Sequence, residues 1–141
     1  TTNTTVTGAD YSFAFSAPVT GLSTTITDID GAYFNGTSSN AGAERVSVSS
    51  SSPISVTITT STYLTGTGTT ADPWRRRPNS TPNLSSLTKS QNDGNVTVSS
   101  AALSQFTLSY RLLDNTTQVG GGPNGSFNLW LTPITFTLLC P

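Results

Sequence analysis

The fold class follows from the stretch SFNLWLTPITFTLL, residues 126–139, which is the most apolar part of the chain. Its apolar residues recur at every second position, a period typical of a β-strand with one buried face. They fall on odd positions before Pro133 and on even positions after it: Phe127, Leu129, Leu131, Ile134, Phe136 and Leu138. An unbroken strand would turn half of this set outward. We therefore expect one strand kinked at Thr132-Pro133, or two short strands, at the centre of a β core.

The same alternation recurs along the rest of the chain. It predicts strands over Tyr11–Val19, Thr24–Ile29, Ala32–Asn35, Arg45–Ser49, Ile54–Thr60, Asn95–Ser99 and Leu103–Leu112. Asp30-Gly31 is a hairpin turn signal between the second and third of these. Eight or nine short strands without a helical period predict an all-β antiparallel β-sandwich. Immunoglobulin-like and jelly-roll Greek-key topologies both fit this pattern.

The length of 141 residues predicts a single domain, residues 1–141. Residues 1–9 are polar and β-prone, and we expect an extended N-terminal arm there. Residues 65–94 hold no strand pattern for long and contain three prolines and an arginine cluster, which predicts a long loop. A loop of this length inside a compact domain is usually functional or mobile.

Charge and hydropathy exclude several classes of function. Seven acids and six bases give a net charge of −1 and are spread thinly, so we predict no nucleic-acid partner and no polybasic membrane surface. No apolar run approaches the ~18 residues of a membrane span. Because the chain contains no Met, even at position 1, we expect a processed product or a fragment, and a removed signal peptide would explain this. The predicted location is extracellular, secreted or at a cell surface.

Possible N-glycosylation sites support secretion. Asn-x-Ser/Thr sequons occur at Asn3, Asn35, Asn79, Asn83, Asn95, Asn115 and Asn124. A chain so rich in Ser and Thr also forms sequons by chance, and Asn-Gly and Asn-Thr pairs are common in turns. Cys140 is the only cysteine, so we expect no internal disulfide; it is either a small buried hydrophobe or one half of an intermolecular bridge.

The residues offer little for catalysis. With no histidine, Ser-His-Asp triads, Cys-His pairs and His-containing zinc sites are excluded. Glycoside hydrolysis needs two facing carboxylates, but Asp30 and Asp93 belong to Asp-Gly turns. Asp28 and Asp30 suggest calcium at a loop, yet the later ligands of an EF-hand loop are missing. We predict no enzyme activity, no cofactor and no metal.

The most distinctive local cluster is Trp74 followed by Arg75, Arg76 and Arg77. It is a possible ligand loop, which would bind a sulfated or sialylated glycan, or an acidic patch, through charge and stacking. Alternatively, the tryptophan plugs the edge of the sandwich and the guanidinium groups pair with Asp72 or Asp93.

The N-terminal segment Asn3-Thr4-Thr5-Val6-Thr7-Gly8, ahead of an all-β body that ends in alternating apolar residues, resembles the subunits of donor-strand-exchange filaments such as chaperone-usher pilins. The resemblance implies that one subunit donates a strand to the next and that a C-terminal strand forms the edge of the receiving groove. The residues that would serve as donor are Val6, Tyr11, Phe13, Phe15, Ala17 and Val19, and those of the groove are Phe127, Leu129, Leu131, Ile134, Phe136 and Leu138. Pilin donor strands carry several large apolar residues, whereas Thr1–Gly8 has only Val6, so Tyr11–Val19 is the stronger donor candidate.

The leading hypothesis is a structural subunit of an extracellular pilus-like filament or surface assembly, whose partners are copies of itself. The alternative is a glycan-binding or adhesive module, or the projecting domain of a viral capsid or fibre. In that case Trp74 and the three arginines would contact cell-surface glycans.

Overall fold

The computed structural model describes residues 4–29, 43–58, 63–77, 92–115 and 129–138, and these residues form β-strands without a helix. All strand pairs are antiparallel. The strands are β1 (Thr4–Thr27), β2 (Ala43–Ser50), β3 (Ser55–Ile58), β4 (Leu64–Thr65), β5 (Arg75–Arg76), β6 (Val96–Asn115), β7 (Trp130–Leu131) and β8 (Thr135–Leu138). The prediction of an all-β antiparallel protein is therefore confirmed.

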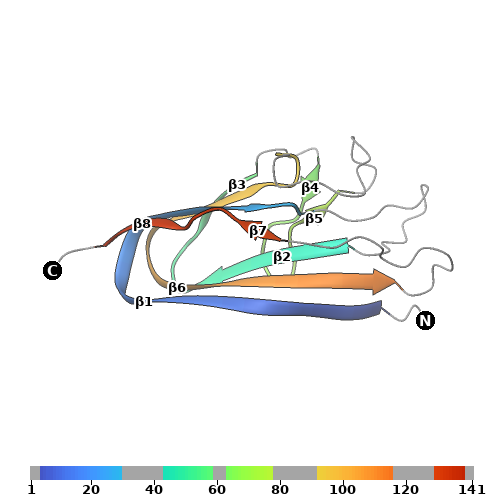
Figure 1. Ribbon diagram of the computed structural model, residues 1–141, viewed down its shortest axis with the longest axis horizontal. Helices are drawn as coiled ribbons and strands as arrows, with labels where there is room; N and C mark the ends of the chain where they lie inside the picture. The colour runs from blue at the N-terminus through green and yellow to red at the C-terminus, as the bar shows by residue number, and fades with distance from the viewer. Residues whose placement is uncertain (1–3, 30–42, 59–62, 78–91, 116–128, 139–141) are drawn as a thin grey trace.

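The framework is a long ribbon made of β1 and β6, which pair from Thr4↔Asn115 to Ile26↔Val96. The pairing is interrupted between Ala14 and Val19, where several residues of β1 oppose Ser104 alone. Pro18 lies in this interruption and cannot donate a ladder hydrogen bond, and extra residues on one strand bend it. The ribbon turns back on itself at this point, so that its two halves lie one above the other (Figure 1).

The curled sheet has two layers. In the lower layer of Figure 1, β2 pairs with the second half of β6, which pairs with the first half of β1. In the upper layer, β3 pairs with the first half of β6, and β7 and β8 pair with the second half of β1. This arrangement is consistent with a β-sandwich.

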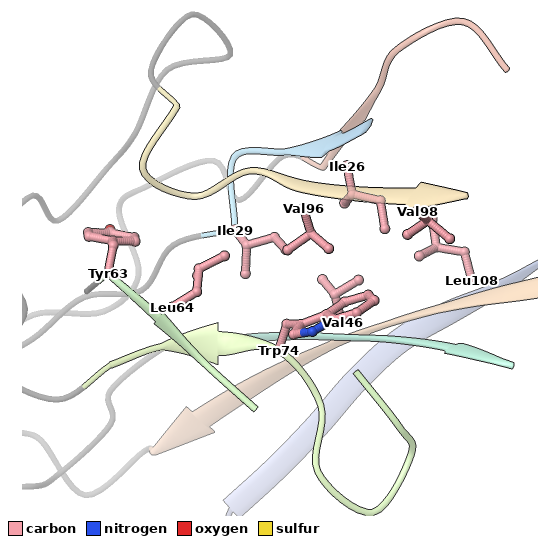
Figure 2. Packing of buried hydrophobic residues seen from close by; sticks show 9 residues of the cluster. All are labelled: Ile26, Ile29, Val46, Tyr63, Leu64, Trp74, Val96, Val98 and Leu108. Carbon is pink, nitrogen blue, oxygen red and sulfur yellow. The ribbon is translucent and has the colours of Figure 1, made fainter. Parts of the chain in front are cut away.

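Apolar residues of both layers meet between them. One cluster contains Ile26, Ile29, Val46, Tyr63, Leu64, Trp74, Val96, Val98 and Leu108, and Figure 2 shows Ile26, Val96 and Val98 pointing from the upper strands towards Val46 and Trp74. A second cluster, nearer the bend, contains Val19, Leu22, Leu103 and Phe106. Phe13 packs against both clusters and stacks on Phe106 with ring centroids 4.6 Å apart. The alternation in β1 and β6 thus supplies the core, as the sequence predicts.

Some strands are longer than predicted. Tyr11–Val19 and Thr24–Ile29 lie mostly in the single strand β1, and Asn95–Ser99 and Leu103–Leu112 lie mostly in β6. The predicted strands at Arg45–Ser49 and Ile54–Thr60 correspond to β2 and β3. The predicted Asp30-Gly31 turn and Ala32–Asn35 strand lie outside the described residues. In the predicted loop 65–94, the described part contains β5 and its pairing with β4.

The C-terminal stretch differs most from its prediction. It forms two short strands separated at Pro133, as expected, and Thr132 is held against β1 by a hydrogen bond from its N–H to Thr25 O at 2.9 Å and another from Thr25 N–H to its Oγ1 at 2.8 Å. However, of the strands that the structure describes, only β1 pairs with β7 and β8, which lie at the outside of the upper layer and are mostly exposed. The prediction that this stretch lies at the centre of the core is therefore wrong.

Candidate functional site

The three arginines of the predicted cluster lie in different environments. Arg75 donates to Asp72 Oδ1 at 2.7 Å and to Pro73 O at 2.9 Å. Arg76 is only 5% exposed and its guanidinium lies 5.5 Å from the centre of the Tyr63 ring. Arg77 is exposed and its backbone N–H donates to Tyr63 O. The three guanidinium groups therefore do not form one patch directed at solvent.

Trp74 is 1% exposed and belongs to the core. Its backbone exchanges two hydrogen bonds with Val46, at 2.8 and 3.0 Å, and thereby extends the edge of β2. Its ring is not accessible for stacking on a ligand from solvent. These contacts and the Asp72–Arg75 pair match the structural alternative, in which the tryptophan plugs the edge of the sandwich.

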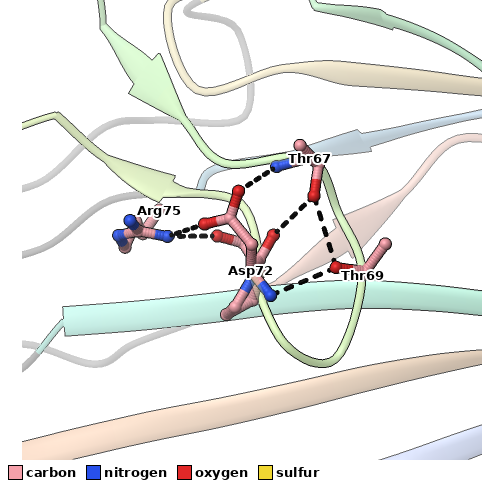
Figure 3. Close-up of polar contacts among 5 residues, drawn as sticks. Thr67, Thr69, Asp72 and Arg75 are labelled. Carbon is pink, nitrogen blue, oxygen red and sulfur yellow. Dashed lines mark hydrogen bonds and ion pairs between the residues drawn. The ribbon is translucent and has the colours of Figure 1, made fainter.

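A tight loop positions this tryptophan (Figure 3). Asp72 accepts from the Thr67 N–H through Oδ2 at 3.0 Å, and its main-chain oxygen accepts from the N–H groups of Thr67 and Gly68. Hydrogen bonding to Arg75, followed by hydrogen bonding to Thr67, lowers the pKa of the Asp72 carboxyl below its ordinary value. Val48 N–H donates to Gly68 O at 2.9 Å, so the loop is also tied to β2.

A pocket of about 220 Å³ lies beside this loop. It is lined by aliphatic side chains of β2, β3 and their connection, including Val48, Ile54 and Val56, and by hydroxyl-bearing residues that include Ser52 and Thr69. Hydroxyls beside apolar carbons suit an uncharged polar ligand such as a sugar.

The predicted donor residues lie within this chain's own sheet. The backbone of Val6 pairs with Leu113, Phe13 stacks on Phe106, and Val19 is fully buried. Phe15 contacts Phe136 edge-on at 5.1 Å, and Ala17 lies in the interruption of the β1–β6 pairing. The predicted arm is extended from Thr4 onward, and every residue from Thr4 to Ala14 pairs with β6.

The first half of β1 has a strand on one side only. Among the described residues, no strand pairs with the other edge of Thr4–Ala14. Tyr11 shares the inward face with Phe13 because the two are two residues apart, and yet it is 51% exposed. Within the described residues, this side of the two layers therefore leaves an inward-facing aromatic side chain accessible to solvent.

The predicted groove residues that the structure describes lie in or beside β7 and β8, the two strands that pair with the second half of β1. Ile134 and Leu129 are partly buried against the core clusters. Leu131 is exposed, as are Phe136 at 44% and Leu138 at 62%. Phe127 lies outside the described residues. Large exposed apolar residues gathered on one side typically mark an interaction surface.

One predicted glycosylation site is buried. Asn95 is 7% exposed and its Nδ2 donates to Asn92 Oδ1 at 3.2 Å, so this fold offers no room for a glycan there. The backbone of Asn115 lies in β6, and the other sequon asparagines fall outside the described residues.

Asp28 follows the end of β1, and burial raises the pKa of its carboxyl group.

Within the described residues, no helix is long and apolar enough to cross a membrane. Likewise, the part of the chain that the structure describes contains no group of three or more Asp, Glu, Cys or His side chains arranged to hold a metal ion. Comparisons of the chain with family models, curated proteins and solved structures find no match.

Proposed function

We propose that this protein is a non-catalytic structural subunit of an extracellular filament or surface assembly, a β-sandwich that polymerises by exchanging the segment Thr4–Ala14 between copies. The observation that carries the proposal is the half-paired first part of β1. This segment is an edge strand, and an irregular bend between Ala14 and Val19 joins it to the rest of the sheet.

Exchange at this position transfers the contacts of Thr4–Ala14 with β6 from one copy to its neighbour. A copy that swings Thr4–Ala14 outward loses pairing with β6 on one side and the Phe13–Phe106 stack. A neighbouring copy can restore the same pairing in the same register, because the partner sequence is identical. Swapping an identical element between copies is a low-cost route to oligomers, and the bend at Phe15–Pro18 is the natural hinge.

The exposed apolar residues on this side of the protein support association at the edge of β1. Tyr11, Phe136 and Leu138 expose apolar surface there, and a neighbouring copy would remove part of that surface from water. A net charge of −1 creates little repulsion between copies. Hydroxyl-rich strands and numerous sequons are in keeping with an extracellular location.

A cross-strand cysteine pair tests the exchange directly. Ser12 and Thr107 are register partners whose hydroxyl oxygens lie 3.1 Å apart, so Ser12→Cys with Thr107→Cys places two thiols within bridging range. Cys140→Ser removes the other thiol. Chains oxidised as monomers are expected to stay monomeric until they are reduced. Chains assembled under reduction and then oxidised are expected to give a ladder of covalent oligomers on non-reducing gels.

A matched pair on the other side of β6 provides the control. Ser47 and Ser109 are register partners in β2 and β6, and β2 is not proposed to exchange, so Ser47→Cys with Ser109→Cys should give no ladder. If assemblies seen by electron microscopy yield only internally bridged chains from the Ser12/Thr107 pair, strand exchange is wrong. If the reduced protein forms no assemblies, the proposal that it forms a homopolymer is wrong.

The pocket beside the Thr67–Asp72 loop favours one alternative, a glycan-binding or adhesive module or a viral projecting domain. Its hydroxyls and aliphatic walls suit a neutral sugar unit. Retention of the monomer on a glycan array, reduced by Thr69→Trp, which fills the pocket, would support this function. A monomer that is not retained would remove it.

A further inference from the structure

We propose that the end of the β1–β6 ribbon, where Thr27, Asp28 and Asn95 come together, binds a hard divalent cation of the calcium type through oxygen ligands. This inference is independent of the proposed strand exchange. It concerns the end of the ribbon opposite to the bend, in the upper layer.

Three oxygen atoms at this end are buried and accept no hydrogen bond. They are Thr27 Oγ1, Asp28 Oδ1 and Asn95 Oδ1, on residues that are 6%, 8% and 7% exposed. Buried polar atoms in folded proteins nearly always have a partner, and an orphaned one calls for an explanation such as an ion. Three such oxygen atoms on two adjoining segments suggest to us that one ion is bound by all three.

The strand register brings these residues together. The last register pair is Ile26 with Val96, and continuing the antiparallel ladder by one step would set Thr27 opposite Asn95. Two residues earlier, Thr25 and Thr97 face each other and their hydroxyl oxygens lie 2.9 Å apart, so Thr27 and Asn95 belong to the same face. The hydrogen bond from Ile29 N–H to Gly94 O, at 3.2 Å, holds the two segments together beyond the strand ends.

Local conformation also leaves oxygens available. Asn95 uses its Nδ2 to donate to Asn92 Oδ1, and its own Oδ1 remains the free acceptor. Asp28 has a φ of 71°, in the left-handed region, which is uncommon for a residue with a side chain. This conformation interrupts the strand alternation, so the carboxylate of Asp28 need not point away from Thr27.

The donor set selects the class of cation. A carboxylate, an amide oxygen and a hydroxyl are hard ligands, and calcium accepts six to eight such oxygens in flexible geometry, with main-chain carbonyls and water completing the sphere. Softer metals prefer thiolate or imidazole, which these residues lack.

Terbium luminescence of the full chain tests the site, because Tb³⁺ occupies calcium sites and is excited by a nearby indole. Trp130 is the register partner of Thr27, so bound Tb³⁺ would lie close to it. We expect saturable emission that Ca²⁺ competes away. Asp28→Asn should weaken Ca²⁺ binding, measured by calorimetry, at least as much as the roughly tenfold loss typical of changes around a metal site. Trp130→Phe should abolish the emission and leave the calorimetric affinity unchanged.

Two further variants keep the test decisive. Asp72→Asn removes a carboxylate of the Thr67–Asp72 loop, which contains none of the proposed ligands, and should leave Ca²⁺ binding intact. Asn95→Asp adds a negative charge at the proposed ligand and should tighten binding even if Asp28→Asn folds poorly. Absence of saturable binding at millimolar Ca²⁺ would overturn the proposal. Binding that survives Asp28→Asn, or that Asn95→Asp weakens, would overturn it as well.

Discussion

Replacing Gly68 with alanine is expected to destabilise the fold strongly, because two separate costs meet at this position. Gly68 has a φ of +79°, and a residue with a side chain pays about 1–2 kcal/mol in that region. A Cβ there would overlap Cζ2 and Cε2 of the Trp74 indole, which is buried and cannot move into solvent. Overpacking of a core typically costs about 1–3 kcal/mol. The expected total is about 2–5 kcal/mol of unfolding free energy.

Gly21→Ala is the matched control for this experiment. Gly21 has a φ of +60°, but no heavy atom lies within 4 Å of a Cβ built on it, so only the conformational cost applies. Both variants are measured by urea denaturation. The difference between their free energies of unfolding then isolates the overlap with Trp74. If Gly68→Ala loses no more stability than Gly21→Ala, the indole does not occupy the position that the structure gives it.

Two other predictions concern the β1–β6 seam and the Thr67–Asp72 loop. Gly8→Ala would place a Cβ against the main-chain oxygen of Tyr110, so it should open the pairing there and lower stability by about 1–3 kcal/mol; an unchanged urea midpoint would contradict this. The folded state lowers the pKa of Asp72 below 3.8, so its stabilisation is present above that pH and lost as the pH falls through the folded-state pKa. Asp72→Asn should therefore melt at a lower temperature than the parent at pH 6, and this gap should close as the pH falls through the folded-state pKa of Asp72; a gap that persists at still lower pH would exclude ionisation as its cause.

The C-terminal stretch shows how far the sequence pattern reaches. Alternation identifies Trp130–Leu131 and Thr135–Leu138 as strands, and the change of parity locates the break at Pro133. Their place in the sheet is not a local property, because it depends on which strand they pair with. Here β1 already has β6 on its other side, so β7 and β8 become the outer strands. An apolar strand is therefore not necessarily a central one.

The long ribbon was divided in the sequence-based prediction for a related reason. The predicted strands stop at Val19 and resume at Thr24, and stop at Ser99 and resume at Leu103, yet β1 and β6 continue through these positions. Pairing partners seventy or more residues apart in the chain, from Ile26 with Val96 to Phe13 with Phe106 and beyond, hold the two halves in one ribbon. A single sequence contains no direct signal for such pairs.

For the candidate sites too, contacts between neighbours in the chain could be predicted, whereas contacts between distant strands could not. The pairing of Arg75 with Asp72 was among the sequence-based alternatives, because the two residues are neighbours in the chain. The juxtaposition of Thr27 with Asn95 was not predicted, since it follows from the register of β1 against β6. From the sequence, Asn95 is a sequon and the start of a predicted strand; its burial argues against a glycan there, and its Oδ1 is one of the oxygens of the cation site that we propose.

The open edge of β1 has chemical features that bear on the proposed exchange. Edge strands of monomeric proteins are usually protected from pairing by outward charges, proline or bulges. Between Thr4 and Ala14 the only charged residue is Asp10, and Arg111 of the adjacent β6 pairs with it at 2.8 Å. The irregularity that contains Pro18 lies beyond this segment, at its junction with the rest of β1. Within the described residues, this edge thus combines a paired charge, no neighbouring strand and, at one end, the irregular bend that we propose as the hinge, and these features favour exchange between copies.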